Sequence, residues 1–470
     1  MEKTKLIATV NITPRLEEQI YQFISTGIDV IRLNMSYLNH EECKKVIETI
    51  NKVNSELNTN VAIMLDLEGP CPRTGEFANG MAYFNTGDKI RIYMNKIKGN
   101  MTGFSVNFPE LIKSLSFHSR LKLSKGNVEL EVIEKGLDYV LCEVIKGGEV
   151  YDHSKIYLSE SKVNRKYLTK GDVDDIVFAH KMNVDFLAIS AIDSAEDILE
   201  VNDLLIELEN SNISLLAKIE NKRTVDDLEN IVKVSDGIIL DRGDLGIDIP
   251  VEKVPNVQKK VIDLCYKYNK LSIITAEFSS FLLKKAVPNR AEVSDLSNLV
   301  SDAIDAIMLT SETTISLNPI STVETIKRII KTSEESIDYK EFFQKSLQKD
   351  KKTIAGTISS SVILAVNELD CKTIIISTNR GRTAKMISGF KPSCPIIAVT
   401  NNKSVAKSLQ LCFGVFPVLI DNYNFDNITE KVKDKVKEEI PINQGDKVIV
   451  TGGYPFKELK YTNFMKIEEI

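Results

Sequence analysis

The sequence predicts an α/β protein built on a (β/α)8 barrel, and two observations lead to this fold class. Eight short apolar segments recur along the chain, most of them about 20 to 35 residues apart, the length of one strand–helix unit. Polar residues stand at or just past the carboxyl end of each segment, the face of such a barrel where chemistry is done. The expected strands are Leu6–Val10, Val30–Ser36, Val61–Leu67, Phe186–Ala191, Leu215–Glu220, Gly237–Asp241, Ser272–Glu277 and Ala306–Glu312.

A β-rich stretch separates the third and fourth expected strands and is far too long for a single helix. Within it, Lys89–Met94, Asn127–Val132 and Tyr139–Val144 have the composition of strands. We therefore expect a small β-barrel domain inserted in a barrel loop, where it would act as a lid. The expected domains are a discontinuous barrel (1–70 and 165–335), the inserted lid (71–164) and a C-terminal α/β domain (336–470).

The end of the chain predicts an open α/β sheet, joined to the barrel by the charged stretch Ser333–Lys351. A helix is expected from Thr353 to Leu369. The expected strands are Thr373–Ser377, Ile396–Thr400, Val415–Ile420, Lys447–Thr451 and Met465–Ile470.

The first of these C-terminal strands runs into Thr378, Arg382 and Thr383 at a helix start, where hydroxyls and arginines can hold a phosphate. A capped helix with solvated arginines explains the same three residues at least as well.

Composition excludes several classes of protein. A net charge of −6 and a pI near 5.6 argue against general nucleic-acid binding. No apolar run approaches 18 residues, so no membrane span is expected, and the first residues lack the apolar core of a signal peptide. The seven cysteines show no paired spacing, which is typical of reduced thiols in the cytoplasm, and the four histidines show no ligand spacing.

The stretch from 215 to 246 carries the strongest chemical signal. It is expected to form strand, helix and strand, and the carboxyl ends of parallel strands lie side by side. Lys218, Glu220 and Asp244 are therefore expected to meet in one small volume, where two carboxylates would repel each other without a cation between them. Their oxygens suit Mg²⁺ held jointly with an anionic substrate. A solvated loop with an ordinary ion pair explains these residues about equally well when they are taken alone.

Two local features complete this stretch. Thr224, with Asp227 three residues later, predicts a capping box at the start of the helix. The turn Gly243–Gly246 is expected to present backbone N–H groups at a helix start, where a phosphate or carboxylate binds.

Motifs along nearly the whole chain resemble those of the pyruvate kinase family. The resemblance implies a TIM barrel with an inserted lid and a C-terminal α/β domain, usually as a homotetramer. It also implies transfer of phosphate from phosphoenolpyruvate to ADP in glycolysis, with Mg²⁺ or Mn²⁺ and with K⁺ as a further candidate. The motifs are Thr4-Lys5, Ile31–Ser36, Leu65-Asp66, Gly69-Pro70, Arg73–Gly75, Ala217–Asn221, Ser235–Gly237, Arg242–Gly246, Arg290–Asp295 and Asp305–Leu309.

The resemblance also assigns roles to individual residues. Glu220 and Asp244 would hold the divalent metal, and Lys218 would face the phosphoryl group in transfer. Arg32 and Arg73 would neutralise phosphates. The backbone of Gly243 and Asp244 would hold the substrate carboxylate. Glu277 stands where the family has a threonine that lies beside the substrate and is tied to enolate protonation. Asn34, Ser36, Asp66 and the carbonyl of Leu67 would form a monovalent-cation site, and Thr378, Arg382 and Thr383 resemble an effector loop.

Several positions depart from the family's pattern. Ile12, Tyr37, Leu38 and Cys71 replace residues on the nucleotide and potassium side. In the lid, the family's Lys-Gly-Val-Asn becomes Ser154–Tyr157. Glu68, Asp193, Asp241 and Glu277 add as many as four acids near an anionic substrate. Unit charges about 4 Å apart cost about 4 kcal/mol at an effective dielectric near 20.

Three hypotheses follow. The first is a working pyruvate kinase whose nucleotide side has changed. The second is a catalytically impaired or inactive paralogue that binds metabolites or acts as a scaffold. The third is a Mg²⁺-dependent enzyme that uses enolate chemistry without a nucleotide. We expect the first, because Lys218, Glu220 and Asp244 are all retained.

Overall fold

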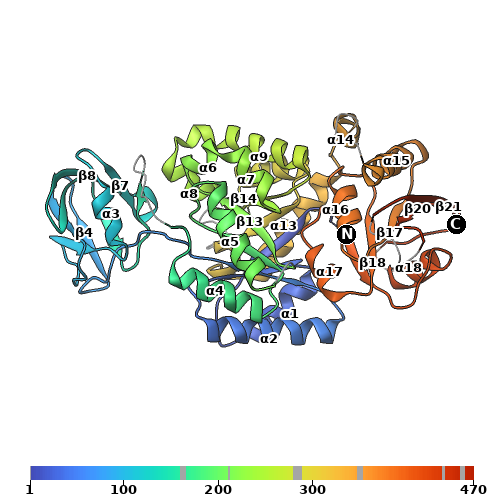
Figure 1. The fold of residues 1–470 in the computed structure, drawn as a ribbon, viewed down its shortest axis with the longest axis horizontal. Coiled ribbons are helices and arrows are strands. Elements are labelled where there is room, and N and C mark those ends of the chain that lie inside the picture. The colour runs from blue at the N-terminus through green and yellow to red at the C-terminus, as the bar shows by residue number, and fades with distance from the viewer. Residues whose placement is uncertain are drawn as a thin grey trace.

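Three bodies lie in a row, with the barrel in the middle, the inserted β domain at one end and the C-terminal domain at the other (Figure 1). The computed structural model describes residues 2–158, 166–209, 212–278, 288–346, 353–436, 440–455 and 461–470. Among these residues, no helix has both the length and the apolar character needed to cross a membrane.

Eight parallel strands close the central barrel in the order β1-β16-β15-β14-β13-β12-β3-β2, which confirms the predicted (β/α)8 fold. Each strand is buried along nearly its whole length, between the barrel interior and the surrounding helices. Such strands carry continuous apolar runs, and these runs made them visible in the sequence. The strands are β1 (Lys5–Thr9), β2 (Val30–Asn34), β3 (Ala62–Asp66), β12 (Phe186–Ile189), β13 (Ser214–Ile219), β14 (Gly237–Leu240), β15 (Leu271–Thr275) and β16 (Ala306–Leu309).

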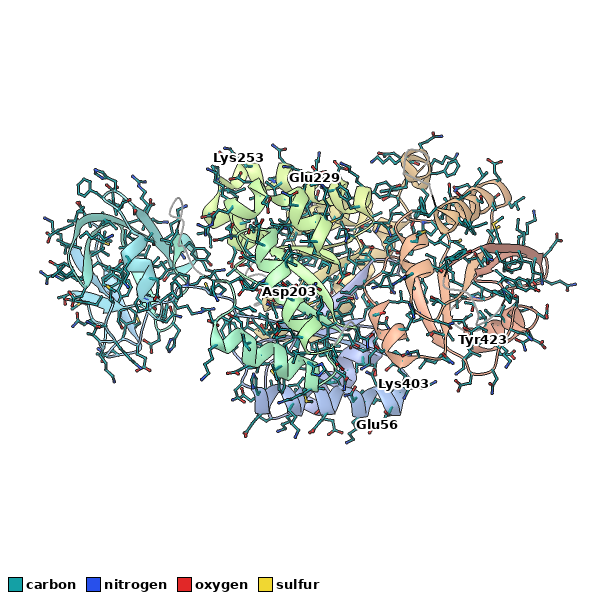
Figure 2. The ribbon with its side chains drawn as sticks, in the orientation of Figure 1. Glu56, Asp203, Glu229, Lys253, Lys403 and Tyr423 are labelled. Carbon is teal, nitrogen blue, oxygen red and sulfur yellow. The ribbon has the colours of Figure 1, made fainter. Side chains whose placement is uncertain are left out.

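Helices surround the barrel and turn their apolar faces to the strands. Charged side chains on the outer surface, including Glu56, Asp203 and Lys253, are exposed (Figure 2). The helices are α1 (Leu16–Thr26), α2 (His40–Leu57), α4 (Lys170–Lys181), α5 (Ala195–Glu207), α6 (Lys222–Asp226), α7 (Leu228–Val234), α8 (Arg242–Asp248), α9 (Val254–Tyr268), α11 (Arg290–Ser301), α12 (Ser311–Thr314) and α13 (Pro319–Glu334).

The capping box predicted at Thr224 is wrong. Asn221 is the N-cap of α6, and its side chain accepts a hydrogen bond from the backbone N–H of Thr224 at 2.9 Å. Thr224 is thus the third residue of a helix that begins earlier than expected, and Asp227 separates two short helices, α6 and α7. Asn221 and Thr224, three residues apart, exchange the same two hydrogen bonds that were expected between Thr224 and Asp227.

The inserted domain is a six-stranded sheet in the order β11-β7-β8-β9-β5-β6 with a separate two-stranded sheet, β10-β4. Both sheets share one apolar core that includes Phe84, Phe104 and Val140. One helix, α3 (Pro109–Ser114), was missed because the segment was interpreted as strand throughout. The strands are β4 (Met81–Phe84), β5 (Lys89–Tyr93), β6 (Gly103–Ser105), β7 (Arg120–Leu123), β8 (Val128–Lys135), β9 (Tyr139–Lys146), β10 (Gly148–Tyr151) and β11 (Tyr157–Leu158).

The C-terminal domain is a five-stranded sheet in the order β19-β18-β17-β20-β21, parallel except for β21. The stretch expected to be only a polar link contains a helix, α14 (Tyr339–Ser346), which buries Phe342. The remaining elements are α15 (Ile354–Leu369), β17 (Thr373–Ser377), α16 (Arg382–Ser388), β18 (Ile396–Thr400), α17 (Lys403–Ser408), β19 (Val415–Leu419), α18 (Ile428–Val436), β20 (Lys447–Gly452) and β21 (Phe464–Glu469). The domain boundaries given above stay predictions.

Candidate active site

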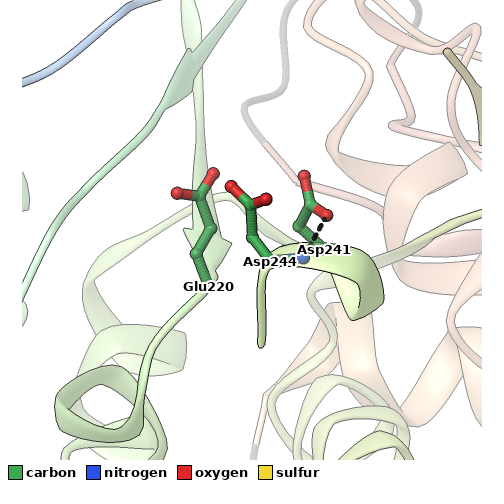
Figure 3. Close-up of side chains that lie close together, drawn as sticks. All are labelled: Glu220, Asp241 and Asp244. Atoms are coloured by element: carbon green, nitrogen blue, oxygen red, sulfur yellow. Dashed lines mark hydrogen bonds between the residues drawn. The ribbon is translucent and has the colours of Figure 1, made fainter. Parts of the chain in front are cut away.

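Three carboxylates gather at the carboxyl ends of β13 and β14. The register pairs Ile219 with Leu240, so Glu220 and Asp241 leave neighbouring strands at the same level. Asp244 follows in the first turn of α8. One carboxylate oxygen from each of Glu220, Asp241 and Asp244 lies within 4.8 Å of the others, and the three side chains point the same way (Figure 3).

The ammonium of Lys218 lies among these acids and is buried. Its Nζ is 2.6 Å from Oε1 of Glu220, 3.5 Å from Oδ2 of Asp66 and 3.6 Å from Oδ2 of Asp241. Burial alone would lower the pKa of Lys218, but Asp66, Glu220 and Asp241 outweigh it and hold the pKa above its ordinary value. The side chain is therefore a permanent cation at this end of the barrel.

Asp66 connects Lys218 to the predicted phosphate-binding residue Arg32. The Nε of Arg32 donates to Oδ2 of Asp66 at 2.8 Å, and its Nη1 donates to Oγ1 of Thr9 at 2.9 Å. The hydroxyl of Ser190 donates to the other carboxylate oxygen at 2.7 Å. Burial raises the pKa of Asp66, but Lys218 and Arg32 outweigh this and hold it below its usual range. The carboxylate of Asp66 thus orients both cations.

A cation from the lid lies between two of the acids. The Nζ of Lys155 is 3.0 Å from Oε2 of Glu220 and 2.5 Å from Oδ2 of Asp244. The hydroxyl of Tyr157 donates to Oδ1 of Asp244 at 2.9 Å. Sequence patterns did not indicate the contacts of Lys155 and Tyr157, because these residues precede their partners by more than 60 positions. The signal was available, since both belong to the lid run that departs from the family's pattern.

The donor set fits a divalent metal. Carboxylate oxygens are the ligands that Mg²⁺ prefers, and the ammonium between Glu220 and Asp244 marks a point where positive charge is stable. Burial raises the pKa of Glu220, but Lys155 and Lys218 outweigh it and leave the pKa below its ordinary value. Burial, followed by the charge of Asp244, raises the pKa of Asp241 to about 6.

The turn predicted to bind the substrate carboxylate is flanked by acids. Asp241 is the N-cap of α8, and its Oδ1 accepts a hydrogen bond from the backbone N–H of Asp244 at 3.3 Å (Figure 3). A Cβ placed on Gly243 would stand 3.7 Å from oxygens of both Asp241 and Glu277. One N–H predicted to hold substrate is therefore already engaged by the side chain of Asp241.

Arg73 lies at a second cluster, on the lid side of β2. Its Nε pairs with Glu68, its Nη1 donates to the carbonyl of His153 at 3.0 Å, and its Nη2 donates to the hydroxyl of Ser36 at 3.2 Å.

The predicted monovalent-cation residues follow β2 and β3. The Oδ1 of Asn34 accepts from the backbone N–H of Ser36 at 3.0 Å. Asn34 and Asp66 are paired neighbours across β2 and β3, which brings the predicted monovalent-cation residues to one edge.

Leu67, the last of the predicted monovalent-cation residues, is buried just past β3, and its backbone N–H donates to Ala188 at 3.0 Å. Two of the acids that depart from the family's pattern also have cationic partners, since Glu68 pairs with Arg73 and Asp193 lies 2.9 Å from Arg223. Fewer uncompensated acids thus surround the site than the sequence suggested.

The predicted effector residues lie at the start of α16, in the C-terminal domain. The hydroxyl of Thr378 accepts from the backbone N–H of Gly381 at 2.9 Å, so it caps its own loop. Thr383 shares a hydrogen bond with Thr462, and Arg382 is exposed.

Comparisons with known proteins agree over the whole chain. The family models "Pyruvate kinase, barrel domain" and "Pyruvate kinase, alpha/beta domain" match residues 1–323 and 356–468. The chain is 35% identical over 475 residues to the pyruvate kinase of Clostridium perfringens, with 100% of both chains covered. It is 35% identical over 477 residues to that of Sporosarcina psychrophila, which covers 100% of this chain and 81% of the relative. A crystal structure of a pyruvate kinase from Cryptosporidium parvum matches with a TM-score of 0.91 at 30% identity, covering 100% of this chain and 96% of that one.

Proposed function

The chain belongs to the pyruvate kinase family, and from this membership we propose that it transfers the phosphoryl group of phosphoenolpyruvate to ADP, giving pyruvate and ATP. It is a phosphotransferase of this family. The observation that carries the proposal is the convergence of Lys218, Glu220 and Asp244 at neighbouring strand ends of the barrel.

The buried ammonium of Lys218 is proposed to face the transferred phosphoryl group. Negative charge on the phosphoryl oxygens is stabilised by a cation that is already fixed and desolvated, because no reorganisation is then needed during transfer. Asp66 orients Lys218 and Arg32 together, so both cations converge on one region at the mouth of the barrel. Arg32 would neutralise substrate phosphate from that position.

Glu220 and Asp244 are proposed to hold Mg²⁺ or Mn²⁺. When bound, a divalent ion supplies positive charge that offsets the negative charge on the substrate oxygens. Asn34, Ser36, Asp66 and the carbonyl of Leu67 are proposed to hold K⁺, and Arg73 and the turn at Gly243 are proposed to contact substrate.

Two further expectations stay proposals. All seven cysteines are buried and free, which supports a cytoplasmic enzyme. A homotetramer is proposed from the family alone.

The test is pyruvate release from phosphoenolpyruvate with Mg²⁺, K⁺ and a panel of nucleoside diphosphates. We expect turnover with at least one diphosphate, and we expect Lys218→Met to lower kcat by at least about 10³-fold. Titration of ADP by calorimetry separates this proposal from an enolate enzyme that uses no nucleotide.

The second candidate is the catalytically impaired paralogue, which the acids Asp241 and Glu277 beside Gly243 favour. That candidate predicts an intact fold and metal binding without turnover. Absence of pyruvate with every diphosphate, from a folded chain that binds Mn²⁺, would exclude the active enzyme and leave this candidate.

A further inference from the structure

Every carboxylate oxygen of Glu220 and Asp244 has a partner from this chain. Oε1 of Glu220 faces Lys218 at 2.6 Å, and Oε2 faces Lys155 at 3.0 Å. Oδ2 of Asp244 faces Lys155 at 2.5 Å, and Oδ1 accepts from the hydroxyl of Tyr157 at 2.9 Å. The acid pair proposed to hold the metal is therefore already satisfied by the protein itself.

The backbone around Lys155 is fixed where the lid joins the barrel. Two connecting segments pair at this point, with Arg73 bridged to Lys155 in antiparallel fashion. The backbone N–H of Ile156 donates to Pro72 at 2.8 Å, and that of Ser154 donates to the hydroxyl of Thr74 at 2.9 Å. These contacts set the root of the Lys155 side chain beside the acids, so its ammonium reaches them with the lid in place.

We propose that Lys155 is a built-in competitor of the divalent metal, whose ammonium occupies the position between Glu220 and Asp244 and must leave before the ion binds. This inference rests on the proposed function only in taking these two acids as the metal ligands. Mg²⁺ binds carboxylate oxygens at about 2.1 Å, so it needs the same oxygens that face Lys155. A divalent ion and an ammonium on the same two oxygens repel each other strongly, because both are partly desolvated.

Metal binding displaces the ammonium of Lys155 and leaves the backbone of Lys155 in place. The departing ammonium has a flexible four-carbon stem, so it can swing away while its backbone stays paired with the segment at Arg73. Metal binding therefore breaks the two ion pairs that hold this part of the lid connection to the barrel. Lys155 in this way links metal occupancy to the contact between lid and barrel.

The test is calorimetric titration of Mn²⁺ into the full chain after removal of metal with a chelator. The variants are Lys155→Met and Lys155→Arg, and the matched control is Lys122→Met. Lys122 also joins lid to barrel, but it donates to the carbonyl of Ile247 at 2.6 Å and touches no acid of the site. We expect Lys155→Met to tighten Mn²⁺ binding roughly 10- to 100-fold, the worth of a charge-assisted contact. Lys155→Arg and Lys122→Met should stay near the wild-type affinity.

Unchanged or weaker Mn²⁺ binding in Lys155→Met would overturn the proposal, and so would equal tightening in Lys122→Met. Absence of Mn²⁺ binding in all variants would overturn it as well. If Lys155→Met does not fold, Lys155→Gln decides the question by the same titration. This titration does not measure turnover. A chain without activity whose variants show the expected Mn²⁺ affinities would therefore contradict the proposed activity and still support competition between Lys155 and the metal.

Discussion

The ammonium of Lys391 lies 2.7 Å from the carboxylate of Asp305, and both side chains are buried where the C-terminal domain meets the amino end of β16. The same carboxylate accepts hydrogen bonds from the backbone of Phe413 at 3.1 Å and of Ser272 at 2.9 Å. One buried acid therefore joins the C-terminal domain to two barrel strands, at the end opposite the candidate active site.

We expect Lys391→Met to destabilise the protein by about 3 kcal/mol, because it leaves the carboxylate of Asp305 buried without its cation. The double variant Lys391→Met with Asp305→Asn should recover part of this loss, since no buried charge then remains. Urea unfolding of the three proteins at one pH measures both effects. A single variant as stable as the wild type would show that the pair contributes nothing to domain docking.

Asp185, also at the amino end of the barrel, predicts a pH-dependent loss of stability. Burial raises its pKa to about 6, although Lys407 and the backbone N–H of Ile63 partly oppose this. The folded pKa lies above the unfolded value near 4, so the folded state binds this proton more tightly. Its contribution to stability is therefore present below about pH 4 and is lost as pH rises to about 6.

We expect Asp185→Asn to be more stable than the wild type at pH 7.5 by about 2 kcal/mol and to differ little at pH 4. The amide oxygen can still accept from Ile63, so the substitution removes the buried charge and its 3.9 Å ion pair with Lys407. Thermal unfolding at both pH values measures the difference, with Asp203→Asn, on the exposed face of α5, as the control. A gain of the same size at both pH values would rule out titration as its cause.

The sequence predicted the barrel because buried parallel strands carry their own signal. Each one is largely apolar and has a polar residue at or just past its carboxyl end, so local composition marks both its place and its functional end. The meeting of Lys218 with Glu220 and Asp244 was predicted because the carboxyl ends of parallel strands lie side by side.

Contacts between domains were not predictable in this way. Lys155 reaches Glu220 only because the two connecting segments of the lid pair beside the barrel, and no local pattern encodes that pairing.

Two helix caps in the barrel were also missed. Asp241 was recognised as an added acid, but its capping of α8 depends on a side-chain rotamer. The cap at Asn221 was missed because Thr224 offered a competing signature within three residues.

Asp241 is expected to weaken phosphoenolpyruvate binding in two ways. It adds a negative charge beside Gly243, and it occupies the N–H of Asp244 that is proposed to bind the substrate carboxylate. We expect Asp241→Asn, which removes the charge and keeps an acceptor, to lower KM for phosphoenolpyruvate roughly 10-fold. Asp241→Ala should lower it further, at a cost of about 1 kcal/mol in stability through the lost cap.

The pH profile of KM tests the charge separately. Because the pKa of Asp241 is raised to about 6, its carboxyl group becomes neutral as pH falls through that value, and substrate binding should then strengthen in the wild type. Asp241→Asn should lose this part of the profile. If log KM changes with pH in the same way in the wild type and in Asp241→Asn between pH 5 and 8, the pH dependence comes from another group.

Glu277 tests whether one substitution limits the reaction. Its exposed carboxylate flanks the turn at Gly243, where the family has a threonine tied to protonation of the enolate. We expect Glu277→Thr to lower KM for phosphoenolpyruvate roughly 10-fold by removing a negative charge, and to raise kcat by restoring the hydroxyl. Glu277→Gln is the matched variant, because it removes the charge without supplying a hydroxyl. If both variants lower KM and only the threonine raises kcat, charge governs binding and the hydroxyl governs proton transfer. If neither KM nor kcat improves in either variant, the charge of Glu277 does not weaken substrate binding, and Glu277 suits this site as it is.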